Sequence, residues 1–290
     1  EKQLLVIDGV IAEGESYAGS IRNETVTGAD TVLEQLEEIS ENKDVKALIV
    51  RVNSPGGAYG ASDDIWHALE QLKTQKKIPV IVSMGDYAAS GGYFVALAGD
   101  KIIAEPSTIT GSIGVLGGKM VLEQLWKKIG VNWNSVNFGE NAGILSFNTK
   151  FSNKEKSIFN KSLDIVYKDF TLKVSKARNL DLNALDKLAR GRVWTGEDAL
   201  KHNLVDGTGG LETAFSEALK AAKIKPAEKF RILYYPKEKT LQEKIQQLVN
   251  GGRGVYMSGA LSVFSSEINE LKQLNRLRYD AVLPPMQINM

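Results

Sequence analysis

A serine among small residues is the first candidate for chemistry. Ser90 lies in the segment AASGG (88–92), shortly after the apolar run PVIVSM (79–84). A serine at a strand-to-helix junction with small neighbours has an exposed hydroxyl and room for a substrate, and the helix start adds free N–H groups. The alternative is an N-cap serine, because serine is favoured at that position anyway. This segment alone does not separate the two interpretations.

A glycine-rich loop follows a second apolar run. The loop NSPGG (53–57) comes directly after VKALIVRV (45–52). Gly56 and Gly57 let the backbone approach a ligand and turn its N–H groups outward. Such groups suit an oxyanion hole, which stabilises charge developing on a carbonyl oxygen. A Pro-Gly-Gly loop by itself is more often a simple turn, but a nucleophile and an oxyanion loop on neighbouring strands would support each other.

The third small-residue loop is TGSIG (110–114). Its Ser112 is placed to hydrogen-bond and orient a catalytic base, although glycine and serine also supply ordinary turn chemistry. All three loops follow buried strands, and parallel α/β sheets bind their ligands at that edge. We therefore expect the three loops to meet.

A nucleophilic serine needs a base, and histidine is poorly placed to supply it. The two histidines are His67, in a helical pattern, and His202, in a late helical stretch, with none between residues 68 and 201. Lysine is the remaining candidate, since serine–lysine dyads are a recognised variant. Such a lysine must be largely neutral, which requires burial to lower its pKa from about 10.4.

The sequence contains no recognisable metal-binding or cofactor-binding motif. Histidines are not clustered, cysteine is absent, and the acidic residues are scattered. No phosphate-binding motif matches either. We expect neither a metal nor a cofactor.

Apolar runs that alternate with amphipathic stretches must position these loops. The expected strands are 4–7, 45–52, 79–84, 101–104 and 132–138. The expected helices are 61–73, 93–98, 120–128 and one capped by Asp30 with the face Val32, Leu33, Leu36 and Ile39. The expected loops are 53–60, 85–92 and 109–114. This alternation predicts an α/β architecture with largely parallel pairing.

Beyond Ser152 the pattern becomes mostly helical. The expected helices are 153–178, 182–189, 195–201 and 212–222, with a further strand at 232–235. We predict a catalytic domain over 1–225 and a C-terminal extension over 226–290. The extension is amphipathic, and we expect it to be helical and to pack on the domain or on a neighbour.

Composition narrows the class of protein. The chain has 290 residues, of which 43% are hydrophobic, and a net charge of +1, which gives no case for a nucleic-acid partner. The lack of cysteine excludes disulfides and thiol catalysis. No apolar stretch approaches the ~20 residues needed to span a bilayer, and no signal-peptide pattern is found. The start at Glu1, directly before a strand, favours a piece of a longer protein, with tag removal or methionine trimming as the alternative.

Four segments in order resemble the protease IV (signal peptide peptidase A) family. They are RVNSPGG (51–57), MGDYAASGGY (84–93), PSTITGSIGV (106–115) and GRVWTGEDALKHNLVD (191–206). The resemblance runs over roughly residues 3–222, and four ordered segments are more specific than any one. It implies a ClpP/crotonase-like α/β fold of stacked ββα units with additional C-terminal helices.

The same resemblance implies a serine endopeptidase with a Ser/Lys dyad. Such an enzyme cleaves remnant signal peptides and other apolar peptides at the bacterial inner membrane, with its catalytic part facing the periplasm. It implies a ring- or dome-like homo-oligomer and membrane association through a segment absent from this chain.

The resemblance also assigns roles by position. Ser90 matches the nucleophile. Gly56 and Gly57 match the oxyanion loop, with the Gly91 N–H as a second donor. Ser112 matches the serine that contacts the base.

The base is where the chain departs from the family pattern. Single-domain members carry their lysine after the strand expected at 132–138, but here the aligned position is Ala142 and the nearby Lys150 is out of register. In two-domain members the N-terminal half supplies the lysine and the C-terminal half the serine, and this chain has the character of such a C-terminal half. An engineered Lys-to-Ala substitution and a chain that has lost activity are the alternatives.

Two rival functions stay open. A crotonase-type acyl-CoA enzyme shares the fold and the oxyanion loop, but it needs a CoA-phosphate site and acidic groups near the loops. Asp63 and Asp64 follow the first loop, where a solvated helix start explains them. The other rival is a non-catalytic half that serves assembly.

Overall fold

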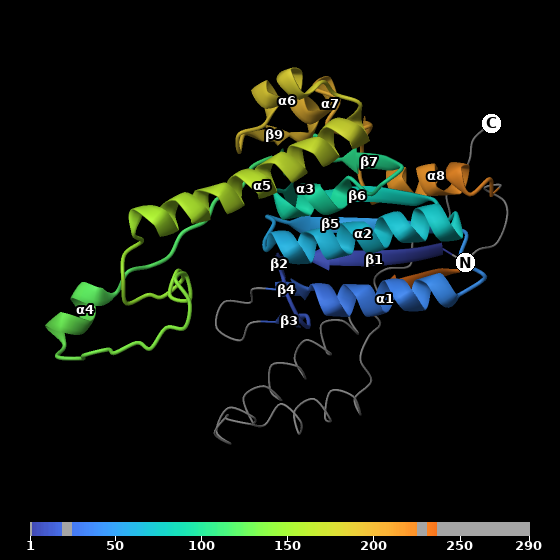
Figure 1. Cartoon of the computed structure of the whole chain (residues 1–290). Helices are drawn as coiled ribbons and strands as arrows, with labels where there is room; N and C mark the ends of the chain where they lie inside the picture. The colour runs from blue at the N-terminus through green and yellow to red at the C-terminus, as the bar shows by residue number, and fades with distance from the viewer. Residues whose placement is uncertain (1, 19–24, 225–230, 237–290) are drawn as a thin grey trace, which may run out of the picture. The chain divides into compact units, whose positions relative to one another are not determined.

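A mainly parallel sheet forms the centre of the part that the computed structural model describes, residues 2–18, 25–224 and 231–236. Its strand order is β10-β7-β6-β5-β1-β11, with β8 paired to β6 and β9 to β8 (Figure 1). Every pair is parallel except β8 with β9. The eight strands are β1 (Lys2–Asp8), β5 (Ala47–Ser54), β6 (Val80–Ala89), β7 (Lys101–Ala104), β8 (Ile109–Gly111), β9 (Val193–Thr195), β10 (Gly207–Thr208) and β11 (Ile232–Tyr235).

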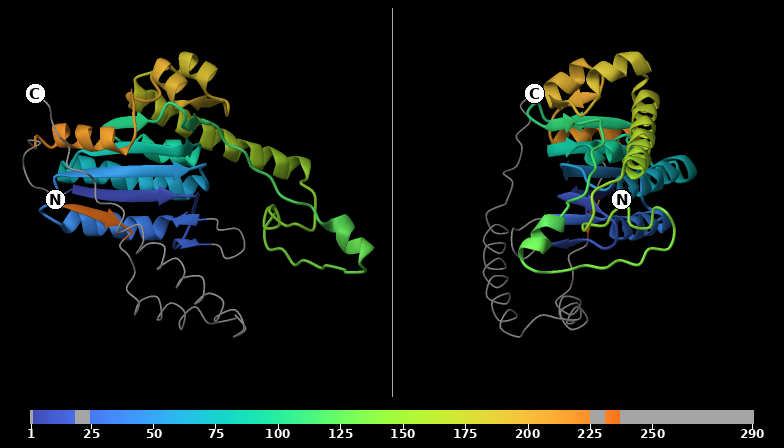
Figure 2. Two further views of the ribbon diagram at one scale, coloured as in Figure 1. Left: turned by 180° about the vertical axis from the view of Figure 1, so that it is seen from behind. Right: turned by 60° about the vertical axis from the view of Figure 1, so that its left-hand side comes forward.

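Helices cover both faces of this sheet. On one face lie α1 (Ala29–Glu41), α2 (Tyr59–Lys76) and α3 (Gly91–Ala96), and on the other lies α8 (Leu211–Ala221) (Figure 2). Along β5, Leu48 and Val50 pack with the first group, whereas Ala47 and Ile49 pack with α8. A strand buried on both faces reads as a continuous apolar run, which is why the sequence predicts these strands well.

A small second sheet and four further helices complete the described part of the chain. The second sheet consists of β2 (Val10–Ala12), β3 (Tyr17–Ala18) and β4 (Thr25–Gly28). The other helices are α4 (Glu123–Lys128), α5 (Asn153–Arg178), α6 (Leu182–Leu188) and α7 (Gly196–Lys201). The bounds of α5 match the prediction, and Ser152 and Glu155 form a capping box at its start. The predicted α/β class with a largely parallel sheet is confirmed.

All three predicted loops are partly strand, and β5 already extends to Ser54. Strand β6 continues through Gly85 to Ala89, and β8 occupies 109–111, because Tyr87, Ala88 and Ala89 pair with Ile109, Thr110 and Gly111. Small and polar residues predict a turn locally, but here tertiary pairing overrides that preference. Asp30 is not the cap of α1 either: Gly28 is the N-cap, and Asp30 lies in the first turn.

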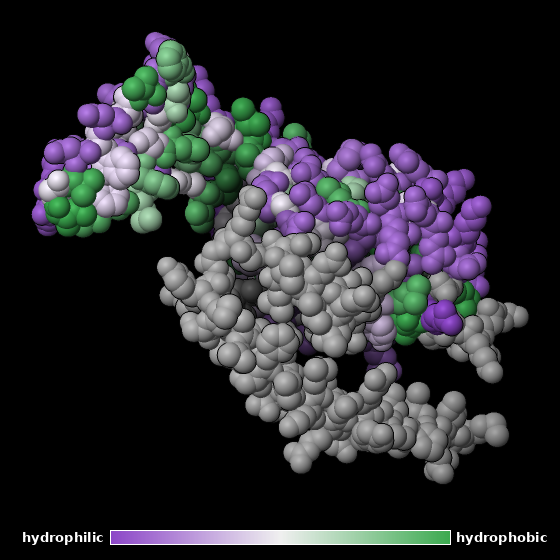
Figure 3. Space-filling view, turned by 90° about the horizontal axis from the view of Figure 1, so that it is seen from below, coloured by the Kyte–Doolittle hydropathy of each residue, from purple (hydrophilic) through white to green (hydrophobic). Residues whose placement is uncertain are grey.

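The predicted strand over 132–138 is wrong. This segment follows α4 and has no strand structure, with Val136 85% and Phe138 92% exposed. A strand needs a partner for its backbone groups, and no described residue pairs with it. These residues belong to a projecting segment, residues 117–152, that extends away from the sheet (Figure 1), and Figure 3 shows hydrophobic side chains gathered on the projecting part at its upper left.

Most of the predicted C-terminal extension, 226–290, lies outside the described residues. The chain divides into two units, 1–236 and 237–290, and the second lies outside the described residues. Strand β11, which lies in the predicted extension, pairs in parallel with β1. Within the described ranges, no helix combines the length and hydropathy that crossing a bilayer requires.

The central strand β5 generates a stability prediction. Leu48 is fully buried, and Leu48→Ala should lower the free energy of unfolding of this chain by about 2–5 kcal/mol through lost burial and a residual cavity. Leu145, which is 60% exposed, is the control, and Leu145→Ala should change the free energy of unfolding by less than about 0.5 kcal/mol. Urea unfolding measures both, and equal effects would contradict the packing described above.

Candidate active site

Ser90 occupies a strained turn between β6 and α3. Its backbone has φ 52° and ψ −119°, a conformation that costs energy in a residue with a side chain. Two hydrogen bonds hold it: the Ser90 N–H donates to Gly111 O at 2.9 Å, and the Phe94 N–H donates to Ser90 O at 2.8 Å. Ser90 stands at the N-cap position of α3, but its side chain makes no capping bond. The hydroxyl is therefore not used as the N-cap interpretation requires.

Gly56 brings the first loop against Ser90. It has φ +110°, and a methyl group there would lie 2.8 Å from both Gly91 N and Ser90 Cβ. Only glycine allows this approach without displacement. The Gly56 N–H itself donates to Ser54 Oγ at 3.1 Å. Gly56 therefore shapes the loop, and its N–H is engaged elsewhere than at an oxyanion.

Gly57 presents the first available N–H group. Ile11 bonds on either side of it, donating to Gly56 O and accepting from the Ala58 N–H, so the bridge leaves the Gly57 N–H unused. A methyl group at Gly57 would lie 1.8 Å from Ile11 O, so this pairing requires glycine. No described residue accepts a hydrogen bond from the Gly57 N–H.

Gly91 presents the second N–H group. It is the first residue of α3, so its N–H has no acceptor within the helix. A methyl group at Gly91 would lie 2.5 Å from Ser62 Oγ and 3.1 Å from Gly57 N, which places the two glycines side by side. Two free N–H groups next to a serine hydroxyl form the arrangement that an oxyanion hole requires.

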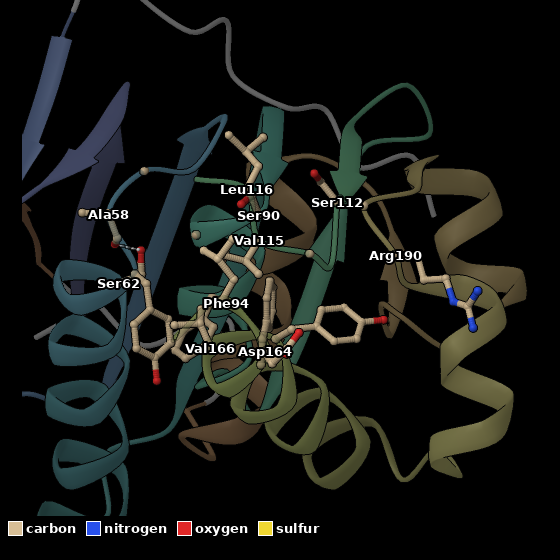
Figure 4. Close-up of a pocket in the computed structure, with 18 residues that line it drawn as sticks. Ala58, Ser62, Ser90, Phe94, Ser112, Val115, Leu116, Asp164, Val166 and Arg190 are labelled. Carbon is tan, nitrogen blue, oxygen red and sulfur yellow. Dashed lines mark hydrogen bonds between the residues drawn. The ribbon is translucent and has the colours of Figure 1, made fainter. Parts of the chain in front are cut away.

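Ser112 lies beside Ser90 across the β6–β8 pair. Ala89 pairs with Gly111, so the next residue of each strand brings the two serines to the same edge. Ser112 has φ 49°, and its N–H donates to Arg192 O at 2.7 Å. Both serines line one cleft, and Figure 4 shows their hydroxyls at the same end of it.

This cleft has a volume of about 920 Å³ and mainly apolar walls. Helix α5 forms one wall with residues at i, i+3, i+4 and i+7: Leu163, Val166, Tyr167 and Phe170. Tyr59 and Phe94 form part of the other wall, and Gly114–Leu116 close one side. The sequence prediction missed these wall residues, although the helical spacing of the α5 residues is a signal for one apolar face.

The histidines and the Ala142 and Lys150 positions, which the sequence analysis did not favour as a base, lie away from the cleft. Its described lining residues include neither lysine nor histidine. His67 is exposed and hydrogen-bonds Gln71, and His202 packs edge-on against the Trp194 ring. Ala142 is exposed in a turn, and Lys150 is exposed in the same projecting segment. The structure thus brings together Ser90, Ser112 and the glycines, but supplies no base from these positions.

Metal chemistry has no candidate ligand set here. No group of three or more His, Cys, Asp or Glu side chains among the described residues is arranged to hold an ion. The cleft presents the Ser90 and Ser112 hydroxyls, two N–H donors and a mainly apolar surface, with Asp164 and Arg190 also among its lining residues.

Comparison with known proteins points to one family. The model of the peptidase family S49 matches residues 72–225, and that of the Clp protease family matches residues 18–109. A putative protease of Synechocystis is 38% identical over 207 residues, which cover 69% of this chain and 74% of that protein. Among solved structures, a mutant of ClpP1 from Listeria monocytogenes aligns with a TM-score of 0.50 at 16% identity, covering 73% of this chain and 93% of the other. The predicted ClpP-like fold is thereby confirmed.

Larger relatives match over only part of their length. The chloroplastic serine protease SPPA of Arabidopsis thaliana is 39% identical over 68% of this chain, and Protease 4 of Salmonella typhi is 36% identical over 86% of it. The matched regions are 29% and 38% of those two proteins. The chain thus spans about a third of the length of these curated relatives.

The close contact at Gly56 generates the next prediction. Gly56→Ala should lower the free energy of unfolding by about 1–3 kcal/mol, because alanine is strained at this φ and its methyl group would meet Ser90 and Gly91. Gly118 has open space around it, so Gly118→Ala should change stability by less than about 0.5 kcal/mol. Thermal unfolding measures the stability of both variants, and a Gly56→Ala protein as stable as the wild type would show that Gly56 does not pack closely against Ser90.

Proposed function

This chain belongs to the serine peptidase family S49, and we propose that it supplies the nucleophile Ser90 of a Ser/Lys dyad whose lysine comes from an N-terminal half or a partner. The observation that carries the proposal is the Ser90 side chain next to the free Gly57 and Gly91 N–H groups in an apolar cleft. Peptide-bond cleavage needs both a nucleophile and a site for the oxyanion.

The reaction proceeds by acyl transfer. A neutral lysine amine takes the proton of Ser90 Oγ while that oxygen attacks the peptide carbonyl carbon. The carbonyl oxygen becomes an oxyanion, which the Gly57 and Gly91 N–H groups stabilise. The resulting ammonium protonates the leaving amine as the C–N bond breaks, which leaves an ester on Ser90. Water activated by the same amine then hydrolyses this ester and regenerates Ser90.

Ser112 is the positioning residue for the incoming amine. Its side chain lies in the cleft at the register position next to Ser90, so a lysine that reaches Ser90 passes within range of it. An amine that enters an apolar cleft loses hydration, which favours its neutral form and lowers its pKa. The same apolar walls that bind substrate therefore make a lysine effective as a base.

The substrates that fit the cleft are apolar peptides with small or aliphatic side chains near the cleaved bond. Support comes from the mainly apolar lining and from the small residues around Ser90. Remnant signal peptides have this character, and we place the enzyme in a homo-oligomer at the bacterial inner membrane with this cleft on the periplasmic side. This placement rests on the sequence resemblance to the protease IV family over segments 51–57, 84–93, 106–115 and 191–206.

The acyl-CoA alternative has less support. Arg190 is the described arginine that lines the cleft, and its guanidinium pairs with Asp186. Asp63 pairs with Lys173 and does not line the cleft; the acidic residue that does is Asp164 on α5, away from the loops that carry Ser90 and Gly57. Calorimetry with CoA separates the two functions, because binding of CoA at micromolar concentration would favour the crotonase-type reaction.

Removal of the nucleophile gives the direct test in the complete, base-containing protein. Ser90→Ala should lower kcat for an apolar peptide by at least about 10³-fold, because no other group forms the acyl-enzyme. Ser40, on α1, is the control, and Ser40→Ala should retain full activity. Peptidase activity that survives Ser90→Ala would refute the assignment.

Complementation tests the origin of the base. This chain alone should cleave peptides poorly, and addition of the half that carries the lysine should restore cleavage. Lys150→Met should leave the restored activity unchanged, because Lys150 is exposed and does not line the cleft. Equal activity of this chain with and without its partner would instead indicate an internal base. A mixture that stays inactive would favour the assembly role.

A further inference from the structure

A charged cluster behind the cleft wall joins three helices. The Lys173 amine of α5 lies 2.5 Å from an Asp169 oxygen and 3.1 Å from an Asp63 oxygen of α2. The same amine lies 4.8 Å from the Trp66 ring centroid and 5.2 Å from that of Phe94, on α3. The Lys173 side chain is only 17% exposed. Lys173 thus contacts α2, α3 and α5 at once.

The cluster continues directly into the cleft wall. The Tyr59 hydroxyl, at the start of α2, donates to Asp169 Oδ2 at 2.7 Å. The Tyr59 and Phe94 rings meet edge to face with their centroids 5.7 Å apart, and the centroids of the Phe94 and Phe170 rings lie 5.0 Å apart. Tyr59, Phe94 and Phe170 all line the cleft, whereas Lys173 does not.

Electrostatics hold the cluster in a charged state. Burial alone would lower the pKa of Lys173, but its bonds to Asp169 and Asp63 outweigh that effect and raise it. Burial and the bond to Asp169 likewise raise the pKa of Tyr59, which keeps its hydroxyl protonated as a donor. Lys173 is therefore unsuited to act as a neutral base, and its charge offsets part of the repulsion between two carboxylates on different helices.

We propose that Lys173 is a positioning residue that clamps α5 against α2 and thereby sets the width of the cleft and the size of the substrate side chain accepted. The proposal rests on the proposed peptidase function. Without the Lys173 charge, Asp63 and Asp169 repel each other across the two helices, and the wall formed by Leu163, Val166 and Phe170 moves outward. The cleft then accepts bulkier side chains and binds small ones less tightly.

Steady-state kinetics of the complete protein test this on two peptides that differ only in alanine or phenylalanine before the cleaved bond. Lys173→Met should raise the phenylalanine-to-alanine ratio of kcat/KM by about tenfold, a size of effect that side-chain fit commonly produces. The change should lie mainly in a higher KM for the alanine peptide, because Ser90 and its N–H donors stay in place. Lys173→Arg, which keeps the charge, should restore the ratio, and Lys176→Met, at an exposed position on the same helix, should leave it unchanged.

The outcomes separate the two proposals. A wild-type protein without peptidase activity refutes the proposed function. An active, folded Lys173→Met protein with an unchanged ratio overturns the clamp, even if its melting temperature falls. Circular dichroism checks the fold, and if Lys173→Met does not fold, Asp63→Asn carries the test, because it removes the ion pair between α5 and α2. Its ratio should rise several-fold, and an unchanged ratio overturns the clamp equally.

Discussion

The strained backbone of Ser90 is the constraint on which the site depends. A residue with a side chain adopts φ 52° only when its surroundings enforce it. Here the Ser90 N–H donates to Gly111 O of β8, and the Gly56 backbone packs closely against the Ser90 side chain. The pairing of β6 with β8 and the bridge between Ile11 and Gly57 both serve this geometry. The sheet therefore positions the hydroxyl and the N–H donors as one rigid unit.

Helix α5 supplies the part of the site that the sheet does not. It covers the edge where the strands end and turns an open surface into a cleft, and it is held there by the packing of Phe170 on Phe94 and by the Lys173 cluster. The reactive groups and the binding wall thus belong to different elements. Changes in substrate preference can arise on α5 without disturbance of the chemistry at Ser90.

Much of the fold, and the meeting of the loops that carry Ser90, Ser112 and Gly57, could be predicted from the sequence, because both leave local signals. Strands buried on two faces read as apolar runs, and the loops at 53–57 and 88–92 carry small residues for a steric reason that the structure shows. The extension of β6 to Ala89 and the absence of a strand at 132–138 could not be predicted, since each depends on whether a pairing partner exists. The sequence also could not predict that the Gly56 N–H is not available to an oxyanion, because this depends on its hydrogen bond to Ser54 Oγ.

The most direct test of this account is a crystal structure of the complete, base-containing protein with a peptide boronate. The boron should be bonded to Ser90 Oγ, with one boron-bound oxygen within about 3.1 Å of both Gly57 N and Gly91 N. An inhibitor bonded to another residue, or an oxygen that faces away from both glycines, would contradict the central claim that this turn receives the acyl group.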